Sequence, residues 1–294
     1  QFCSYCKIPY VRGKLKSRYD KDIVDEVKQL AVSGCREVVL TGIHLSSYGV
    51  DMSECKSFVE LGGKPLALLA SEIGKVRGIE RIRFGSLEPR IITDDFVKDI
   101  SGNKKVCPHF HLSLQSGCDK TLAAMNRKYT ADDYRKACSI LRKYYDRPAI
   151  TTDIIVGFPG EDDGDFEESL RFVKETCFSD IHVFKYSKRD GTKAAGMQGS
   201  VPENVKHERS RQMIEAGVKL TERYNLSFVG ERQLCLVEEK IMIDGREYYT
   251  GHNERYIKLV FAADDISENM QNELVRVVAT GILADNMLEC EKTP

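Results

Sequence analysis

From Arg36 onward, short β-branched runs alternate with amphipathic helical stretches, and this alternation limits the chain to a few folds. Alternating strand and helix signals are typical of parallel βα units. The pattern does not separate a barrel from an open doubly wound sheet. In both folds ligands bind beyond the carboxyl ends of the strands. The expected strands are Glu37–Thr41, Arg81–Ser86, His109–Leu114, Ala149–Val156 and Ile181–Tyr186.

The stretches between these strands predict helices. In the first of them, Ile23, Val24 and Val27 recur at helical spacing, and Gly34 is placed to end the helix. The predicted helices are Asp20–Ser33, Ala67–Val76, Lys120–Met125, Ala131–Tyr144 and Asp165–Glu175, with a further helix that begins at Thr93.

A different pattern begins after a long charged helix at Glu203–Phe228. Strand-like runs then follow one another without helices, which predicts a small all-β barrel of roughly 60 residues. The runs are Gln233–Glu238, Tyr248–Gly251, Tyr256–Phe261 and Leu274–Ile282. Because single cores stop growing near ~250–300 residues, we expect two domains, an α/β domain over 1–229 and a β domain over 230–294, with a boundary near Gly230.

The charge balance excludes a strongly basic protein. The formal net charge is -1 and the pI is near 6.7, so RNA binding requires local basic patches. Candidate patches lie at 12–18, 127–128 and 185–193, although each alone is typical of a solvated face. Ten cysteines without a visible secretory signal, and no apolar run near the ~20 residues of a membrane helix, favour a cytoplasmic protein with no membrane role.

The pair Cys3 and Cys6 carries the clearest chemical signal. Two thiolates on one tight turn suit zinc, a redox pair or an iron-sulfur cluster. Zinc needs a second pair of ligands at comparable spacing, and the sequence has no second CxxC and no HxxxH. A redox pair is expected to open a helix after a strand, which this series of βα units does not offer. Iron-sulfur ligation by three cysteines remains, with the third ligand still to be found.

The opening residues Gln1–Tyr10 resemble the end of the CxxxCxxC motif of radical S-adenosylmethionine enzymes, specifically the methylthiotransferase family. The resemblance implies that Cys3 and Cys6 hold a [4Fe-4S] cluster whose open iron site binds S-adenosylmethionine. The first cysteine of that motif lies four positions before Cys3, outside this sequence. We therefore expect the chain as given to hold substoichiometric cluster and to be inactive alone.

The resemblance continues along the chain, through segments similar to Leu40–His44, Ser86–Pro89, Leu112–Gly117, Met125–Thr130 and Asp153–Glu161. It implies that cofactor contacts come from Tyr5, Thr41, Gly42, Glu88, Gln115, Ser116, Arg127, Gly157 and Phe158. Glu88 has two interpretations, as a ligand of a ribose hydroxyl or as a cap of the helix at Thr93. Phe158 is suited to packing against an adenine. We expect one cavity to gather Cys3, Cys6, Gly42, Gln115, Gly157 and Phe158.

Two further segments resemble substrate-binding parts of the family. Phe184–Ala195 is similar to its last strand and the loop that follows, except that the family has Pro at the position of Asp190. Gly230–Leu288 resembles a TRAM domain, a small RNA-binding barrel, with a stabilising β-appendage as the alternative. The residues expected to contact RNA are Arg12, Arg18, Lys188, Arg189, Tyr249 and His252.

The resemblance is strongest to the branch that acts on threonylcarbamoyladenosine in bacterial tRNA. It implies an α/β fold, a partial (βα) radical S-adenosylmethionine barrel without its first strand, followed by the all-β TRAM barrel. The implied reaction adds a methylthio group to C2 of the modified adenosine beside the anticodon. It requires an electron donor such as a flavodoxin or ferredoxin, and a second [4Fe-4S] cluster in an N-terminal domain outside this sequence. The alternatives left open are isopentenyladenosine in tRNA, a ribosomal protein aspartate, and a non-catalytic tRNA-binding fragment. No catalytic residue is assigned.

Overall fold

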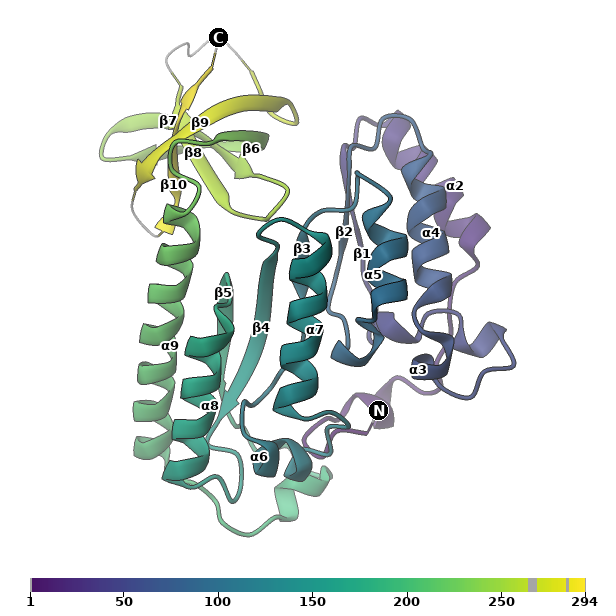
Figure 1. The fold of residues 1–294 in the computed structure, drawn as a ribbon, viewed down its shortest axis with the longest axis vertical. Coiled ribbons are helices and arrows are strands. Elements are labelled where there is room, and N and C mark those ends of the chain that lie inside the picture. Colours follow the sequence, from purple (N-terminus) through teal and green to yellow (C-terminus); the bar gives the residue numbers. More distant parts are fainter. Residues whose placement is uncertain (1, 264–268, 284–285, 294) are drawn as a thin grey trace.

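The computed structural model describes residues 2–263, 269–283 and 286–293. A parallel α/β part is followed by a closed β-barrel (Figure 1). The parallel strands are β1 (Glu37–Leu40), β2 (Arg81–Phe84), β3 (His109–His111), β4 (Ala149–Val156) and β5 (Asp180–Lys185). Strand β1 pairs with β2, and β3, β4 and β5 form a second sheet. Isolated bridges from Ile82 to Val106 and from Leu87 to Leu112 join the two sheets, so the strands lie in sequence order.

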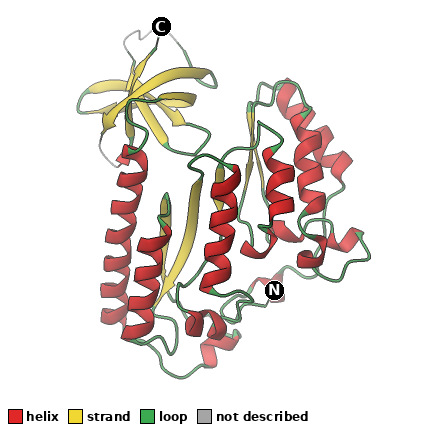
Figure 2. Ribbon diagram, viewed as in Figure 1, coloured by secondary structure: helices red, strands yellow, loops and turns green. Residues whose placement is uncertain are grey.

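Helices follow the strands and pack against them (Figure 2). They are α1 (Ile8–Val11), α2 (Asp20–Val32), α3 (Phe58–Leu61), α4 (Lys64–Gly74), α5 (Asp94–Ser101), α6 (Asp119–Ala124), α7 (Ala131–Tyr144), α8 (Asp163–Thr176) and α9 (Glu203–Leu226). Strand β4 and helix α7 have their predicted bounds, and the other predicted elements of this part differ only at their ends. The prediction of parallel βα units is confirmed.

Side-chain caps fix where several helices begin. Thr130 and Asp133 form a reciprocal capping box at the start of α7, and Asp162 and Asp165 form another at α8. Thr93 Oγ1 accepts a hydrogen bond of 3.2 Å from Phe96 N and so begins α5. Each such cap stabilises a helix by about 1 kcal/mol.

The two faces of the parallel strands have different surroundings. Side chains alternate between the faces, and one set packs under the helices in the main apolar core. That set includes Val38, Leu40, Ile82, Phe84, Phe110, Ile150 and Ile154. The opposite set forms what we call the inner face, whose members are Glu37, Val39, Arg81, Arg83, His109, His111, Thr151, Asp153, His182 and Phe184. Parallel sheets covered on both faces are almost wholly apolar. The polar side chains of the inner face therefore indicate that it has a role other than packing in an apolar core.

The C-terminal strands close into a small barrel in the order β10-β8-β7-β6-β9. The strands are β6 (Arg232–Ile243), β7 (Arg246–His252), β8 (Lys258–Ala262), β9 (Leu274–Ile282) and β10 (Leu288–Lys292). All pairs are antiparallel except β8 with β10. A Cβ on Gly251 would overlap Leu236 O, so only glycine allows the close approach of β7 to β6. The all-β prediction is confirmed, although β10 was not predicted, and the domain boundary near Gly230 stays a prediction.

Buried arginines join this barrel to the parallel strands. Arg81 donates to His252 O at 2.9 Å and to Leu234 O at 2.5 Å, and Arg83 donates to Glu254 O at 3.1 Å. Arg81 and Arg83 both belong to the inner face, so the barrel covers one end of that face. The N-terminal segment lies near the other end of the strands (Figure 1). No helix among the described residues is long and apolar enough to cross a membrane.

Candidate active site

The two N-terminal cysteines lie on one tight turn that is fixed to the protein behind it. Cys6 N donates to Cys3 O at 3.1 Å and closes the turn. Between them, Ser4 is only 3% exposed; its amide donates to Met125 O at 3.0 Å and its hydroxyl donates to Ala124 O at 2.8 Å. The turn is therefore anchored by the residue between the cysteines, which leaves the thiols of Cys3 and Cys6 partly exposed.

Both cysteines line a cavity of about 360 Å³ at the carboxyl ends of the strands. The other lining residues come from loops after β1, β2 and β3, and from α1 and the end of α6. They are Tyr5, Ile8, Pro9, Ile43, His44, Ser46, Ser86, Leu87, Glu88, Ser113, Gln115 and Arg127. Cys3, Tyr5, Cys6, Glu88, Gln115 and Arg127 were predicted for this site. The structure brings these six together, although their contacts with a cofactor stay a prediction.

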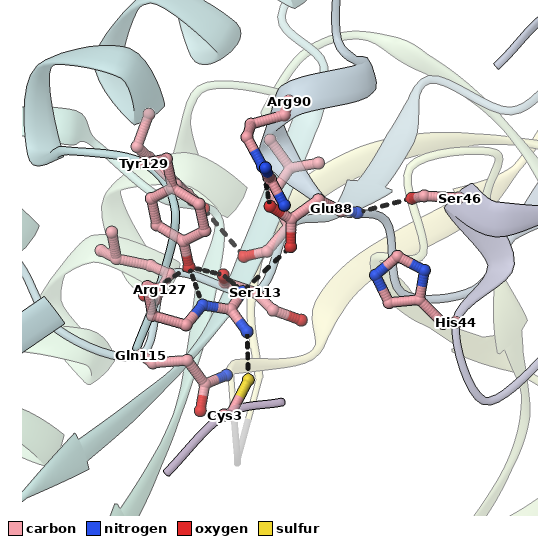
Figure 3. Close-up of polar contacts among 12 residues, drawn as sticks. Cys3, His44, Ser46, Glu88, Arg90, Ser113, Gln115, Arg127 and Tyr129 are labelled. Carbon is pink, nitrogen blue, oxygen red and sulfur yellow. Dashed lines mark hydrogen bonds and ion pairs between the residues drawn. The ribbon is translucent and has the colours of Figure 1, made fainter. Parts of the chain in front are cut away.

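Arg127 connects the cysteine turn to the rest of the cavity wall (Figure 3). It donates to Cys3 Sγ at 3.3 Å, to Glu88 Oε2 at 3.3 Å, to Ser113 O at 3.0 Å and to Tyr129 Oη at 2.7 Å. Its side chain is 7% exposed. Arg127 thus holds the sulfur of Cys3, the carboxylate of Glu88 and the backbone of Ser113 in one arrangement.

The charge of Arg127 is retained despite burial. Burial opposes the charged form, but Tyr129, Tyr5, Glu88 and Cys3 outweigh it and raise the pKa of Arg127 above its ordinary value. Burial and the neighbouring Cys3 raise the pKa of Tyr5, so its hydroxyl keeps its proton and donates to Gln115 Oε1 at 3.1 Å. The cavity wall thus holds one fixed cation beside the cysteines and a neutral phenol.

Glu88 is fixed by hydrogen bonds to its backbone amide and to its carboxylate. Its backbone amide donates to Ser46 Oγ at 2.8 Å, and its carboxylate accepts from Arg90 at 2.8 Å and from Arg127. It is 4% exposed. The alternative that Glu88 caps α5 is wrong, because Thr93 fills that position. A ribose contact from Glu88 stays a prediction.

His44 is a cavity residue that the sequence placed only near the cofactor loop. Its Nδ1 lies 2.6 Å from Ser47 Oγ, and its ring packs edge-on against Phe58 with centroids 4.9 Å apart. Burial lowers the pKa of His44, although Glu88 acts in the opposite direction. Its Nε2 is buried and has no hydrogen-bond partner among the described residues. Such an atom beside a cavity is suited to a ligand.

Gln115 reaches the cavity through an unusual backbone conformation. Its φ of 74° lies in the left-handed region, where residues other than glycine are uncommon. Its amide donates to Asp153 O at 2.8 Å and its carbonyl accepts from Ile155 N at 2.9 Å, so β4 holds this conformation. Ser116 is 1% exposed and its hydroxyl accepts from Cys118 N at 3.2 Å, which places it at the start of α6 rather than in the cavity wall.

Besides Ser116, four predicted cofactor residues lie away from the cavity wall. Thr41 and Gly42 are exposed at the end of β1, and the residues after them, Ile43 and His44, line the cavity instead. Phe158 is fully buried beneath the cysteine turn, where its ring meets Tyr5 and Tyr186 at centroid distances of 6.2 Å and 5.2 Å. The expectation that one cavity gathers all six residues is therefore wrong for Gly42, Gly157 and Phe158.

Gly157 has a structural reason of its own. Its φ is 72°, and a Cβ there would overlap the side chain of Lys206 on α9. Its amide donates to Glu161 Oε1 at 2.8 Å. Glycine is therefore needed where β4 turns against α9, and this packing accounts for the residue without a ligand.

The residues predicted to contact RNA lie in different surroundings. Arg12, Arg18, Lys188 and Arg189 are exposed. Tyr249 is 3% exposed in the core of the C-terminal barrel, so its predicted RNA contact is corrected: its ring is not accessible. His252 lies at the joint with the parallel strands, 2.7 Å from Glu238 Oε1 and stacked on Tyr256.

Metal ligands in the described part of the chain are limited to the cysteine pair. No group of three or more His, Cys, Asp or Glu side chains gathers among the described residues. Cys3 and Cys6 can supply two thiolates to a cluster, and a third cysteine ligand stays a prediction. The donor set, the adjacent Arg127 and the unpartnered Nε2 of His44 fit a cluster and a polar ligand beside it.

Comparison with known proteins gives a consistent result. Residues 1–173 match the Radical SAM superfamily. Threonylcarbamoyladenosine tRNA methylthiotransferase MtaB of Bacillus subtilis is 37% identical over 278 residues, which are 94% of this chain and 59% of that protein. The tRNA-2-methylthio-N(6)-dimethylallyladenosine synthase of Carboxydothermus hydrogenoformans is 39% identical over 280 residues, 95% of this chain and 61% of that protein. Its counterpart in Clostridium novyi is 42% identical over 237 residues, which are 81% of this chain and 51% of that protein.

The chain thus spans between 51% and 61% of the length of these curated relatives. Among solved structures, the radical S-adenosylmethionine methyltransferase TsrM from Kitasatospora setae has a similar fold, with a TM-score of 0.50 and 13% identity. The match covers 66% of this chain and 36% of that one. At that identity, the likeness bears on the fold alone.

Proposed function

Because this chain belongs to the radical SAM superfamily, we propose that it is the catalytic core of a tRNA methylthiotransferase. Family membership implies a [4Fe-4S] cluster and S-adenosylmethionine. The observation that carries the proposal is the anchored cysteine turn, with both thiols at the same cavity and an arginine on Cys3. When bound, the cluster and S-adenosylmethionine supply a radical by reductive cleavage of the cofactor.

The residues of the cavity divide into two tasks. Cys3 and Cys6 hold the cluster, and Arg127 donates a hydrogen bond to the sulfur of Cys3. Glu88, His44 and Gln115 offer polar groups that orient the amino and carboxylate ends of S-adenosylmethionine and its ribose. These side chains are already fixed by their neighbours, so little ordering is needed when the cofactor binds.

The substrate we propose is threonylcarbamoyladenosine in tRNA, with the methylthio group added to C2. The similarity to MtaB, over 94% of this chain, supports it. Dimethylallyladenosine in tRNA is the second candidate, because synthases that make its methylthio derivative are 39% and 42% identical to this chain. The two candidates share the reaction and differ in the group on N6 of the adenosine.

The C-terminal barrel and the basic loop after β5 serve, in this proposal, to bind tRNA. A closed five-stranded barrel of this size suits a TRAM-like RNA-binding domain. Exposed Lys188 and Arg189 lie in the loop whose Asp190 O accepts a 2.8 Å hydrogen bond from Lys7 Nζ, next to the cysteine turn. Backbone phosphates near the reacting nucleotide would meet these cations first. We also propose a cytoplasmic location and an electron donor such as a flavodoxin or ferredoxin.

Nucleoside analysis tests the proposal. A deletion strain is complemented with the full-length gene, or with the same gene carrying Cys6→Ser, and the nucleosides of its tRNA are identified by mass. We expect a methylthio derivative of the modified adenosine beside the anticodon with the first gene and none with the second. Iron content after anaerobic reconstitution should fall in the variant. Identical tRNA nucleosides in the deletion strain and the strain complemented with the unaltered gene would contradict the proposal.

A further inference from the structure

Between the cavity and the C-terminal barrel, part of the inner face of the parallel strands is open to solvent. Val39 on β1 is 52% exposed, Phe184 on β5 is 53% exposed, and His182 is also exposed. The opposite face of the same strands is buried under helices. Exposed apolar and aromatic side chains on a strand face are unusual unless that face binds something.

A hydrogen-bonded cluster lies in the middle of this face. His111 Nδ1 is 2.9 Å from Thr151 Oγ1, and its Nε2 is 3.3 Å from Asp153 Oδ2. The ring of His182 stacks on His111 with centroids 5.8 Å apart and planes 27° apart. Thr151 Oγ1 at Nδ1 and the carboxylate of Asp153 beside Nε2 hold the ring from both sides. His111 is thus fixed in orientation, and His182 is the exposed member of the stack.

The cluster is adjacent to the cysteine cavity. Asp153 O accepts the amide hydrogen of Gln115 at 2.8 Å, and Gln115 and Ser113 both line that cavity. Two residues along an extended strand cover about 6.6 Å, so His111 lies about that far from Ser113. A ligand whose reacting atom is at the cavity can therefore place a substituent against the cluster.

The C-terminal barrel closes the far end of the same face. Tyr256 is 52% exposed; its ring stacks on His252 at 4.2 Å, with the guanidinium of Arg83 4.8 Å from its centroid and the ring of His109 at 5.3 Å. Its positive φ of 63° is maintained by Asn253, whose carbonyl accepts from Tyr256 N at 3.0 Å. The phenol is thus held beside His109, two residues before His111 on β3.

We propose that His111, Asp153 and His182, with Tyr256 as the floor, bind the polar substituent on N6 of the substrate adenosine and select the threonylcarbamoyl group. This inference rests on the proposed function and deepens it. The threonylcarbamoyl group carries a carboxylate, a hydroxyl and a urea, which can pair with these side chains. A dimethylallyl group cannot, and it would leave the polar cluster desolvated without partners. Phe184, two residues after His182 on β5, offers apolar surface for the purine ring.

The test compares two tRNA substrates with the full-length enzyme after anaerobic reconstitution. One tRNA carries threonylcarbamoyladenosine beside the anticodon and the other carries dimethylallyladenosine. The variants are His182→Phe, which retains a ring that can stack on His111, and Asp153→Asn. The matched control is His207→Phe, which changes an exposed histidine on α9. For each protein, kcat/KM for the methylthio product is measured on both substrates, together with iron content and the urea unfolding midpoint.

We expect the unaltered enzyme to prefer the threonylcarbamoyl substrate by at least ~100-fold. His182→Phe and Asp153→Asn should each lower that preference at least ~10-fold, mainly through KM, and His207→Phe should leave it unchanged. Normal iron content separates lost recognition from lost cluster. An unchanged preference in both folded variants would overturn the inference.

Two other outcomes distinguish the inference from its premise. If the unaltered enzyme prefers the dimethylallyl substrate, the inference is wrong while the proposed methylthiotransferase function stands. If it modifies neither tRNA, the proposed function fails and the inference falls with it.

Discussion

The two ends of the inner face are both built around buried arginines, but the arginines have different kinds of partners. At the carboxyl ends of the strands, Arg127 contacts a thiol, a carboxylate and a phenol beside a cavity. At the amino ends, Arg81 and Arg83 donate mainly to backbone carbonyls of the C-terminal barrel. Backbone carbonyls do not titrate, and here they are occupied by the arginines. The arginines of the two regions are buried alike. The reactive site differs from the structural joint in the partners of its arginine.

The largest expected effect is on the cysteine turn. Cys3→Ser removes a cluster ligand while the anchor at Ser4 remains, so product formation should fall more than the ~10–100-fold typical of residues behind the ligands. Thermal stability of the cluster-free protein should change little, because Cys3 is partly exposed. Cys177→Ser, at an exposed cysteine, is the control. Product formation by Cys3→Ser at the rate of the control would remove Cys3 from the site.

Arg127→Lys tests the role of the buried arginine at the carboxyl ends of the strands. Lysine keeps the charge but cannot reproduce the fork that reaches Cys3, Glu88 and Ser113 together. We expect product formation to fall about 10–100-fold with iron content partly reduced. Stability should fall by about 1–3 kcal/mol, because polar groups around Glu88 lose a buried partner. Activity and iron content equal to those of the unaltered protein would contradict a role for Arg127 at the cluster.

Arg83→Met tests the joint between the C-terminal barrel and the amino ends of the parallel strands. Arg83 is paired with Glu37 at 2.8 Å, and the two side chains are 3% and 14% exposed. Removing one partner of such a buried pair costs about 3 kcal/mol, so the urea midpoint should fall. Iron content should stay near normal because the cysteine cavity is at the other end. Arg36→Met, which breaks a pair with side chains 34% and 57% exposed, should cost less than about 1 kcal/mol. Similar losses in the two variants would contradict the assignment of Arg83 to the joint.

His109 makes the amino end sensitive to acid. Burial, then Arg83 and the nearby His111, His252 and His182, lower the pKa of His109 to about 3. Because the unfolded chain takes up a proton near its ordinary pKa of 6.5 and the folded chain does not, stability is retained above about pH 6.5 and lost as pH falls towards 3. At pH 5 the loss from this group is about 2 kcal/mol.

His109→Phe should therefore reduce the fall in unfolding free energy between pH 7 and pH 5 by about 2 kcal/mol. Urea titrations at the two pH values measure the difference, which is independent of any constant cost of the substitution. His207→Gln, on the exposed face of α9, should leave the fall unchanged. If the unfolding free energy of His109→Phe falls between pH 7 and pH 5 as much as that of the unaltered protein, this histidine is protonated in the folded protein.

The smallest expected effect is on stability and tRNA binding at Arg189, which lies outside both ends of the inner face. Arg189 is exposed in the loop after β5, so Arg189→Ala should change stability by less than about 0.5 kcal/mol. If Arg189 contacts a phosphate, the slope of log affinity for tRNA against log salt should become shallower by about 0.7. Arg211→Ala, at an exposed arginine paired with Glu208 on α9, serves as the control. Equal salt slopes for the two variants would exclude this contact.

Local sequence pattern predicted much of the fold. Ala149–Val156 is a continuous strand because its β-branched residues fit both faces, and Ala131–Tyr144 begins at a capping box that is visible in the sequence. The site residues Glu88, Gln115 and Arg127 were predicted from the family resemblance. Glu88 and Gln115 follow β2 and β3, and parallel strands bring their carboxyl ends together, whereas Arg127 follows α6.

The remaining features depend on packing between distant segments. Phe158 follows a strand as the site residues do, but its side chain turns beneath the cysteine turn, and no local pattern records which way it points. Tyr249 is one of two adjacent tyrosines on β7, and the one that enters the barrel core depends on register with β6 and β8. The joint links Arg81 and Arg83 to residues more than 150 positions away. Spacing in the sequence carries no signal for such contacts.

The anchoring of the cysteine turn also couples two movements. Ser4 O accepts from Ala194 N at 2.8 Å, and Lys7 Nζ donates to Asp190 O at 2.8 Å, so the turn is tied to the segment after β5 at two points. A loop that swings outward to admit a folded nucleic acid must either drag the cysteines with it or break these two tethers. If RNA binds at this segment as proposed, a displacement of the segment would act on the position of the thiols through these two hydrogen bonds.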